Sequence, residues 1–345
     1  MIPIQNIYYM LSYAFQVLNE QGYKNIATEQ FNNTGELMAA ILEKGIAIQL
    51  KRGLGKEYIL QTEALSSLRG KIDIAESIKT QSMLRKQLIC TYDEFSVNSI
   101  MNRIIKSTVE LLLRSNISKQ RKKNLRKLMV YFSEVDFIDL YTVNWNVQYN
   151  RNNQTYHMLI SICYLVVKGL LQTQSNGHTE LMDFLDEQRM CRLYEKFILE
   201  YYRKEFKNQF TANASQIPWQ LDNEENSMLP VMQSDIMLQS GEKVLIIDAK
   251  YYEHSTQVQF DKHTLHSGNL YQIFTYVKNK GYELREKDHT VSGMLLYAKT
   301  DEEIYPNNVY QMSGNQITVR TLDLNLPFDE IAGQLNTIAK THFDL

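Results

Sequence analysis

Two aspartates and a lysine in the C-terminal half of the chain have the types and the spacing of a metal-dependent hydrolytic site. Asp248 and Lys250 lie two residues apart in KVLIIDAKYY, an apolar run typical of a buried strand, so their side chains leave the same face. The preceding run VMQSDIMLQ and a turn at residues 240–242 predict a hairpin. In that hairpin Asp235 lies within one or two residues of the position opposite Asp248, where Cβ atoms are roughly 4.5–5.5 Å apart.

This set favours phosphodiester hydrolysis with a bound cation. Two carboxylates this close repel each other, and Mg²⁺ is usually held by one or two carboxylates with waters and substrate phosphates, so Asp235 and Asp248 are the predicted metal ligands. Lys250 is then placed to orient or deprotonate the attacking water, or to stabilise the developing negative charge. The alternative is an ordinary salt bridge between Asp248 and Lys250 at a strand end. The apolar run VLII and the matching position of Asp235 favour a site.

Three further side chains are candidates for the same site. Glu195, in the amphipathic segment LYEKFILEYYRKEF (193–206), is a candidate third carboxylate, and the alternative is an exposed glutamate paired with Lys196. Gln272 and Tyr276 are four residues apart in LYQIFTYV and therefore share one helix face. They are candidates to contact the metal-bound water or the DNA backbone, and the alternative is a purely structural role on a packing face.

The elements that must position these residues form two expected domains, as 345 residues exceed what one core usually serves. Periodicity predicts helices over residues 4–19, 34–45, 97–114, 156–174, 193–206 and 268–279. It predicts strands over 68–78 and 292–298 and a β-hairpin around Gly53 and Gly55. We therefore expect an α+β N-terminal domain over 1–150 and an α/β domain over 151–345, with a mixed central sheet flanked by helices. The Asn-rich stretch QYNRNNQTY (148–156) is the candidate linker.

Bulk composition restricts the possible partners. A net charge of −2 gives no global attraction to nucleic acid, so local basic residues or a partner must supply DNA affinity. The basic run from Arg114 to Lys127 is either a solvated helix face or a DNA contact. Three distant cysteines predict neither a zinc site nor a disulfide framework. The chain shows no signal peptide or bilayer-spanning run, so we expect a cytoplasmic protein without a membrane partner.

Several segments resemble known families. Asp235, twelve intervening residues and Asp248-Ala249-Lys250 resemble the PD-(D/E)xK nuclease motif, although Ser234 stands where proline is usual. Gln272-x-x-x-Tyr276 resembles the Q-x-x-x-Y element of the RecB-like branch, and Glu195 matches its helical acidic residue. IPIQNIYYMLSYAF, RGKIDIAESI, NRIIKSTV and LIIDAKYY together resemble the McrC family, the nuclease subunits of McrBC modified-cytosine restriction systems, from about residue 3 to beyond residue 300. The resemblance implies a PD-(D/E)xK nuclease fold, with catalytic roles for these six residues.

The resemblance also implies partners and a biological role. It implies an McrB-like AAA+ GTPase hexamer that binds GTP, reads 5-methylcytosine in double-stranded DNA and takes the N-terminal domain of this chain into its ring. Docking stimulates GTP hydrolysis, and pairing of two McrC nuclease domains between two rings lets both strands be cut, as phage defence requires. This chain has no G-x-x-x-x-G-K-[ST] motif, in agreement with a motor supplied by the partner.

Two other functions remain open from the sequence. The chain could act as a non-catalytic activator of a AAA+ GTPase, with Lys51 and Arg52 in the expected hairpin as candidates for entering the ring pore. For those two residues an ordinary exposed hairpin is the alternative. The chain could also be a stand-alone RecB-like nuclease, which robust cutting without partner or nucleotide would favour.

Overall fold

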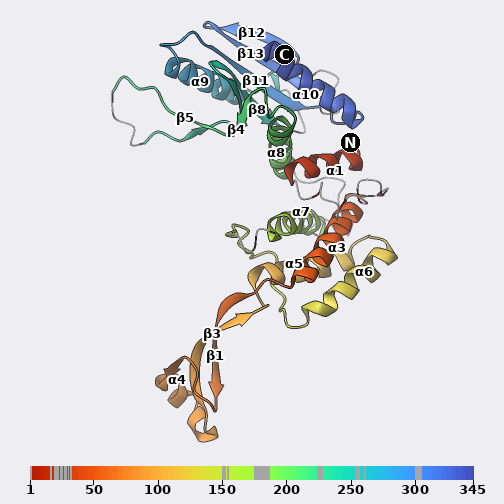
Figure 1. The fold of residues 1–345 in the computed structure, drawn as a ribbon, viewed down its shortest axis with the longest axis vertical. Coiled ribbons are helices and arrows are strands. Elements are labelled where there is room, and N and C mark those ends of the chain that lie inside the picture. The colour runs from red at the N-terminus through yellow and green to blue at the C-terminus, as the bar shows by residue number, and fades with distance from the viewer. Residues whose placement is uncertain are drawn as a thin grey trace. The chain divides into compact units, whose positions relative to one another are not determined.

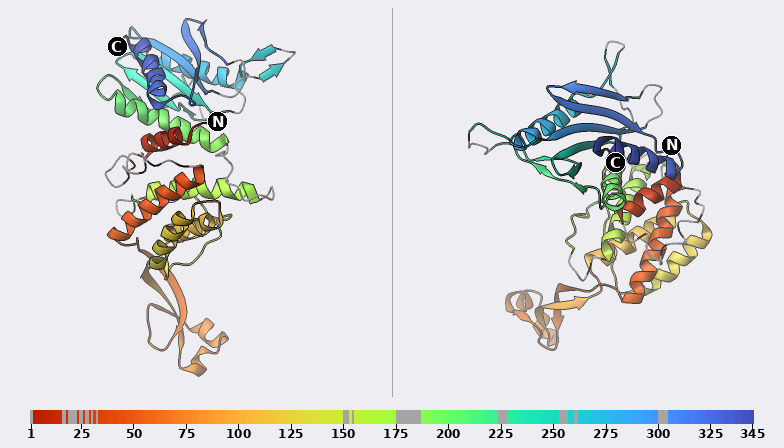
Figure 2. Two further views of the ribbon diagram at one scale, coloured as in Figure 1. Left: turned by 90° about the vertical axis from the view of Figure 1, so that its right-hand side faces the viewer. Right: turned by 45° about the horizontal axis from the view of Figure 1, so that its top comes forward.

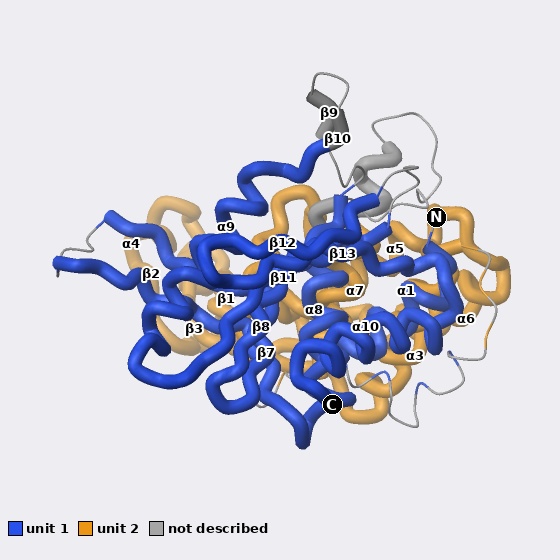
Figure 3. The backbone as a smooth tube through the Cα atoms, turned by 90° about the horizontal axis from the view of Figure 1, so that it is seen from above, with its two compact units in different colours: residues 1–27, 184–345 blue, residues 28–183 orange. Residues whose placement is uncertain are grey.

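The chain folds into two compact units that differ from the expected domains. The computed structural model describes residues 2–15, 33–149, 155–174, 187–223, 228–252, 257–259, 262–299 and 305–345, with single positions 18, 23, 26, 29, 31 and 153. One unit comprises residues 1–27 and 184–345, and the other comprises residues 28–183 (Figure 3). The expected division at residue 150 is therefore wrong: residues 1–27 belong with the C-terminal part of the chain, and residues 151–183 belong with its middle part.

Helix packing explains this correction. The opening helix α1 (Ile4–Ala14) packs against α8 (Glu187–Glu205), so it belongs with the C-terminal part of the chain. Helix α7 (Tyr156–Gln174) packs against α3 (Thr34–Arg52) and α5 (Ile100–Arg114), so it belongs with the middle of the chain. The Asn-rich stretch predicts a loop, but its composition does not indicate whether the helix that follows packs in the first core or in the second. Residues 150–152 and 154 of that stretch lie outside the described residues.

The discontinuous unit is built on a mixed six-stranded sheet, which confirms the expected α/β architecture. Its strands are β4 (Thr211–Asn213), β7 (Ile236–Ser240), β8 (Lys243–Lys250), β11 (Thr290–Ala298), β12 (Asn308–Met312) and β13 (Asn315–Leu322). They lie in the order β12-β13-β11-β8-β7-β4. β8, β11 and β13 run parallel, whereas the pairs β12–β13, β7–β8 and β4–β7 are antiparallel. The carboxyl ends of the three parallel strands therefore share one edge of the sheet.

Helices flank this sheet (Figure 1). Helix α9 (Ser267–Glu283) connects β8 to β11 and packs against β8, β11 and β13, while α8 packs against β4, β7 and β8. Helix α10 (Phe328–Phe343) packs against β13. A Cβ atom on Gly293 would lie 2.8 Å from Ile273 and 2.9 Å from Val277, so glycine on β11 permits the close approach of α9. Among the described helices, none is long and apolar enough to cross a bilayer.

The second unit combines packed helices with a long strand pair. Helices α3, α5, α7 and α6 (Lys119–Met129) pack on one another. β1 (Glu57–Leu65) and β3 (Leu88–Ser96) form an antiparallel pair from Glu57↔Ser96 to Leu65↔Leu88, and β2 (Lys71–Asp73) pairs with β3. This pair and α4 (Ile74–Lys79) extend away from the helices of the same unit (Figures 1 and 2). We call residues 57–96 the strand projection.

A three-residue junction holds the base of the projection. The Tyr156 hydroxyl donates to Asn102 Oδ1 at 2.8 Å and accepts from the Gly55 N–H at 2.7 Å. The Asn102 amide donates to the Gly55 carbonyl at 2.9 Å. A Cβ atom at position 55 would lie 3.0 Å from the Tyr156 ring, so any other residue would press on the ring and glycine leaves it room. A closed hydrogen-bond network of three residues therefore lies where the strand projection joins the helices of its unit.

Two predicted strand segments are wrong in this unit. The expected hairpin around Gly53 and Gly55 does not form, because α3 continues to Arg52 and Gly53 ends it with a φ of 90°. Lys51 and Arg52 therefore occupy the last helical turn, where their positive charges interact favourably with the negative end of the helix dipole. The expected strand over 68–78 is limited to β2, because the Asp73 carboxylate accepts the Glu76 N–H at 2.9 Å and starts α4. Ile74, the first residue of α4, is 62% exposed.

The basic run predicted as a solvated face or a DNA contact contains one residue that fits neither description. The Arg121 guanidinium is largely buried and forms ion pairs with Glu43 at 2.8 Å, Glu36 at 3.3 Å and Glu29. Arg121 therefore fastens α6 to α3 and to the chain before it. Of the remaining cations on this helix, Lys122 is partly buried, and the others are exposed: Lys119, Lys123, Arg126 and Lys127.

Candidate active site

The β7–β8 hairpin places Asp235 opposite Asp248. The last pair of the register is Ile236↔Ile247, so the next position on each strand brings the two aspartates across from each other. The Ala249 N–H donates to Asp235 Oδ2 at 3.0 Å, which fixes this carboxylate beside β8. The turn at Gly241, with a φ of 57°, sets this register. The structure thus brings the two carboxyl groups to one end of the hairpin, as their spacing predicted.

Asp248 is almost completely buried, with 1% of its side chain exposed. Burial raises its pKa to about 7, and the charge of Asp235 acts in the same direction, whereas Lys250 lowers it. The Lys250 ammonium lies 3.0 Å from Asp248 Oδ2 and is 13% exposed. Neither Asp248 oxygen accepts a well-directed hydrogen bond from the described residues. A buried carboxyl group with unused acceptor capacity is a place where a cation gains much binding energy.

Lys250 remains a cation at this site. Burial lowers the pKa of its ammonium, but the charges of Asp248 and Asp235 and the close ion pair with Asp248 together raise the pKa above its usual value. A lysine with a raised pKa releases its proton poorly near neutral pH. Of the roles expected from the sequence, orientation of water and stabilisation of negative charge therefore fit Lys250 better than deprotonation of water.

Glu195 on α8 faces the same acidic pair. Burial raises the pKa of its carboxyl group, and the charge of Asp235 raises it further. The Cys191 thiol, one helical turn earlier, donates to Glu195 Oε1 at 3.1 Å. The alternative pairing of Glu195 with Lys196 is not formed, because the Lys196 ammonium lies 4.1 Å from the centre of the Phe15 ring. The structure therefore brings Glu195 into the electrostatic field of Asp235 and Lys250.

Gln272 and Tyr276 form a pair of their own on α9. The Gln272 amide donates to the Tyr276 hydroxyl at 2.9 Å, which confirms that the two side chains share one helix face. Tyr276 is buried in the core between α9 and the sheet, together with Ile273 and Val277. Within the described part of the chain, no hydrogen bond or ion pair joins this pair to the three carboxylates. Packing is the role that the structure describes for Tyr276.

The structure adds residues to the site that the sequence analysis missed. Tyr297 on β11 pairs in register with Lys250, and its hydroxyl accepts from the Asn269 amide at 3.0 Å. The Tyr252 hydroxyl donates to the other end of the same amide at 3.4 Å. Burial raises the pKa of Tyr297, and the charge of Asp248 contributes. The signal for Cys191 was its four-residue spacing from Glu195, but the parallel β8–β11 register that locates Tyr297 is not readable from one sequence.

A cavity of about 400 Å³ opens beside the acidic residues. Its lining combines charged, polar and apolar side chains from α8, from the segment after β4 and from residues 233–235, which precede β7: Arg192, Glu195, Lys196, Leu199, Ala214, Gln233, Ser234 and Asp235. Its volume falls within the range of ligand pockets, roughly 300–1,000 Å³. The candidate carboxylates Glu195 and Asp235 are therefore accessible from this side.

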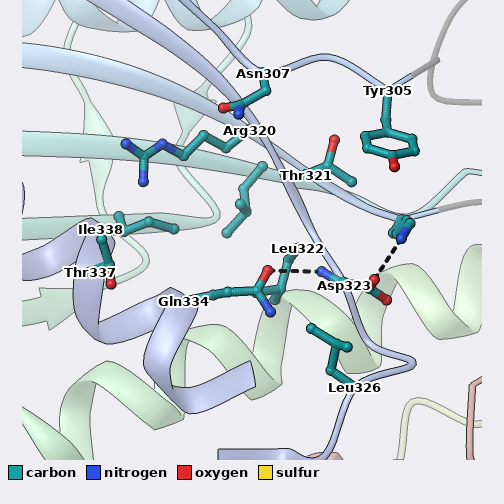
Figure 4. A pocket seen from close by; sticks show the side chains of 12 residues that line it. Tyr305, Asn307, Arg320, Thr321, Leu322, Asp323, Leu326, Gln334, Thr337 and Ile338 are labelled. Atoms are coloured by element: carbon teal, nitrogen blue, oxygen red, sulfur yellow. Dashed lines mark hydrogen bonds and ion pairs between the residues drawn. The ribbon is translucent and has the colours of Figure 1, made fainter. Parts of the chain in front are cut away.

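A second cavity, of about 630 Å³, lies at the carboxyl ends of β11 and β13 against α10 (Figure 4). The Lys299 ammonium forms an ion pair with Asp323 at 2.7 Å at its edge, and the Asp323 N–H donates to Gln334 Oε1 at 3.2 Å (Figure 4). None of the six candidate residues lines this cavity. It provides an Asp–Lys pair in the same unit that is separate from the candidate site.

The donor set at the β7–β8 hairpin fits a hard divalent cation. Asp235 and Asp248 offer carboxylate oxygens, and the unsatisfied buried oxygens of Asp248 are acceptors of the kind that Mg²⁺ prefers. No cluster of three or more His, Cys, Asp or Glu side chains with metal-binding geometry occurs among the residues that the structure describes. Mg²⁺ sites commonly use only one or two carboxylates and complete the shell with waters and phosphate oxygens.

The family model for McrBC 5-methylcytosine restriction system components matches residues 5–298. The chain belongs to this family. A member, the Type IV methyl-directed restriction enzyme EcoKMcrBC of Escherichia coli (strain K12), is 29% identical over 330 residues, which cover 94% of this chain and 93% of that protein. The McrBC relationship therefore includes the middle unit as well as the candidate site.

Two solved complexes of the same system are also similar. A half-complex from a tetradecameric assembly of Thermococcus gammatolerans McrB AAA+ hexamers with bound McrC matches with a TM-score of 0.48 at 18% identity, covering 97% of this chain and 76% of that chain. The cryo-EM structure of the Thermococcus gammatolerans McrBC complex matches with a TM-score of 0.42 at 21% identity, covering 59% of each chain.

Proposed function

We propose that this chain is the Mg²⁺-dependent DNA endonuclease subunit of a GTP-driven restriction complex that acts on modified cytosine. The observation that supports this most strongly is the buried Asp248 carboxyl group, with Asp235 opposite and the Lys250 ammonium 3.0 Å away. Family membership adds the biological setting, namely a restriction system. We further propose that the catalytic domain has the PD-(D/E)xK fold and that two copies pair to cut both strands.

Each side chain has a distinct task in the proposed hydrolysis. Asp235 and Asp248 would hold Mg²⁺, which would supply positive charge to offset that of the phosphate and would acidify water. Lys250 keeps its proton, orients the attacking water and offsets negative charge that develops on the phosphate. Glu195, with its raised pKa, is placed to take or return a proton beside Asp235. Gln272 and Tyr276 remain proposed contacts to the DNA backbone.

A second role, activation of a AAA+ GTPase partner, is favoured by the strand projection. Its surface carries large apolar side chains that a free protein seldom exposes, including Leu84 at 81%, Tyr58 at 75% and Leu60 at 67%. We propose that these side chains contact an McrB-like hexamer, which binds the GTP. This role is compatible with cleavage, because it uses the other unit of the chain.

Plasmid cleavage with the reconstituted partner tests the nuclease assignment. Methylated and unmethylated plasmids are incubated with Mg²⁺, with and without the partner and GTP. We expect Asp248→Asn and Lys250→Met to lower the cleavage rate at least ~100-fold, the lower range for loss of a catalytic acid–base or charge-stabilising group. Stimulation of partner GTPase activity should survive in both variants, since neither residue lies in the strand projection.

A matched control comes from the other Asp–Lys pair of this unit. Asp323→Asn and Lys299→Met remove a comparable ion pair at the same edge of the sheet and should leave cleavage near the native rate. Normal cleavage by both site variants would refute the assignment. Robust cutting by the chain alone, with neither partner nor GTP, would instead favour a stand-alone nuclease.

A further inference from the structure

We propose that Arg192 and Lys196 of α8 form a binding site for a second phosphate of the DNA strand whose scissile phosphate lies at the carboxylates. This inference rests on the proposed nuclease function and extends it to residues outside the nuclease motif. Both cations line the 400 Å³ cavity that Glu195 and Asp235 also line. A phosphodiester chain that reaches the acidic pair through this cavity must therefore pass the two cations.

Helix geometry places the two cations together. Arg192 and Lys196 are four residues apart on α8, so they lie one above the other on the same face of the helix. Leu199, one turn further, and Ala214 from the facing segment complete the wall with small or apolar side chains. The lining of the cavity therefore brings two positive groups and two carboxyl groups together.

Neither cation makes a direct contact with a carboxylate of the described residues, although the charge of Arg192 acts on Glu195 and that of Glu200 acts on Lys196. Among the described residues no ion pair involves Arg192 or Lys196, although other basic side chains on helices are paired, such as Arg203 with Glu200 at 2.7 Å. The half-buried Lys196 ammonium contacts the face of the Phe15 ring instead of a carboxylate. Burial lowers the pKa of Lys196, and the charge of Glu200, which is paired with Arg203, offsets this only in part. Arg192 is exposed. A partly buried ammonium without a contacting carboxylate favours an anionic ligand from outside the chain.

The chemistry of the cavity selects a phosphodiester over a free carboxylate ligand. Arginine and lysine bind phosphate oxygens through charge-assisted hydrogen bonds, and such contacts position DNA without reading its sequence. The neighbouring carboxyl groups repel an isolated anion, but a polymer can place one phosphate on a metal at those groups and the next on the two cations. The near-neutral net charge of the chain makes such local cations the means of holding DNA.

Salt-dependent DNA binding tests this site without requiring cleavage. The full-length chain binds a fluorescein-labelled duplex in Ca²⁺ between 50 and 200 mM NaCl, and anisotropy gives the association constant. Each phosphate contact contributes about 0.9 to the slope of log K against log salt. We expect Arg192→Gln and Lys196→Met each to reduce the slope by about 1, and the double variant by about 2. The methionine retains the aliphatic contact with Phe15.

Lys207→Met is the matched control, since Lys207 is exposed just after α8 and does not line the cavity. Its slope should match that of the native chain. Native slopes for both cavity variants, or no salt-dependent binding by the native chain, would overturn this inference. Loss of slope in Arg192→Gln and Lys196→Met while Asp248→Asn still cuts DNA supports the phosphate site and rejects the nuclease assignment. Native slopes for the two cavity variants, together with loss of cleavage in Asp248→Asn, would reject the phosphate site and support the nuclease assignment.

Discussion

At the scale of single residues, Asp248 combines deep burial with two charged neighbours. Burial raises its pKa from 3.8 to about 7, so the folded chain without metal holds a proton that the unfolded chain releases above pH 4. The contribution of Asp248 to stability is therefore complete below about pH 4 and is lost as the pH rises toward 7. A difference of three pKa units corresponds to at most about 4 kcal/mol.

This linkage predicts that, in EDTA, the free energy of unfolding of the discontinuous unit is higher at pH 5 than at pH 8, by about 2–4 kcal/mol. Urea titration followed by Trp219 fluorescence, in a Trp145→Phe background, reports on that unit alone, because each unit contains one tryptophan. Asp248→Asn should remove most of the pH dependence. Mg²⁺ should stabilise the native chain at pH 8, since it favours the ionised carboxylates. Equal stability at both pH values in the native chain would contradict the prediction.

The positions of the candidate carboxylates could be predicted from the sequence, because the alternation of side chains along a strand and the register of a hairpin depend on residues close together in the chain. Asp235 and Asp248 belong to consecutive strands joined by a short turn, so counting residues from the turn places them opposite each other. The position of Tyr297 could not be predicted, because it lies beside Lys250 only through the parallel pairing of β8 with β11, two strands separated in the chain by α9. Lys196 was placed with Glu195 by proximity in sequence, but the Phe15 ring, 181 residues earlier, takes its ammonium instead.

At the scale of elements, the junction below the strand projection depends on one hydroxyl group. Tyr156→Phe removes a group that both donates to Asn102 and accepts from Gly55, and leaves the buried Asn102 and the partly buried Gly55 without this partner. We expect this substitution to lower the free energy of unfolding of the middle unit by about 1–3 kcal/mol. Urea titration with Trp145 as the reporter, in a Trp219→Phe background, measures the loss.

Tyr131→Phe is the control for this prediction. Its side chain is 68% exposed, so loss of its hydroxyl group should change stability by less than about 0.5 kcal/mol. A loss of similar size in both variants would show that the junction has no special role.

Most helices were predictable, and the failures have identifiable causes. Helix α7 matches the expected residues 156–174, because its apolar residues repeat with helical period over five turns. Residues 46–52 alternate apolar and polar side chains, yet they continue α3, because helix propagation from a long buried segment outweighs a short local pattern. The segment containing β12, β13 and α10 was not interpreted from the sequence, although Ile317 and Val319 alternate as strand residues do.

At the scale of the whole molecule, the strand projection can be removed without opening a gap. Glu57 and Ser96 are paired, so their Cα atoms lie about 4.5–5.5 Å apart, and an Asn-Gly turn in place of residues 58–95 can join them. We expect this deletion to abolish stimulation of partner GTPase activity, because the exposed apolar side chains leave with it. GTP hydrolysis by the reconstituted partner is the measurement.

Mg²⁺-induced stabilisation at pH 8, measured through Trp219, should be unchanged in the deletion, since the two aspartates lie in the other unit. This control separates loss of partner contact from general misfolding. Unaltered GTPase stimulation by the shortened chain would remove the activator role of the projection.

The interruption of one unit by the other affects how the chain matures during synthesis. The apolar face of α1, with Ile7 and Leu11 buried, packs against α8, but residues 28–183 are translated between them. At roughly 5–20 residues per second, the first helix leaves the ribosome about 10–30 seconds before its partner. The middle unit can mature meanwhile, whereas the candidate site must wait for β8 and β11, which are translated later. A nascent chain can thus present the proposed partner-binding surface before the proposed nuclease site is assembled.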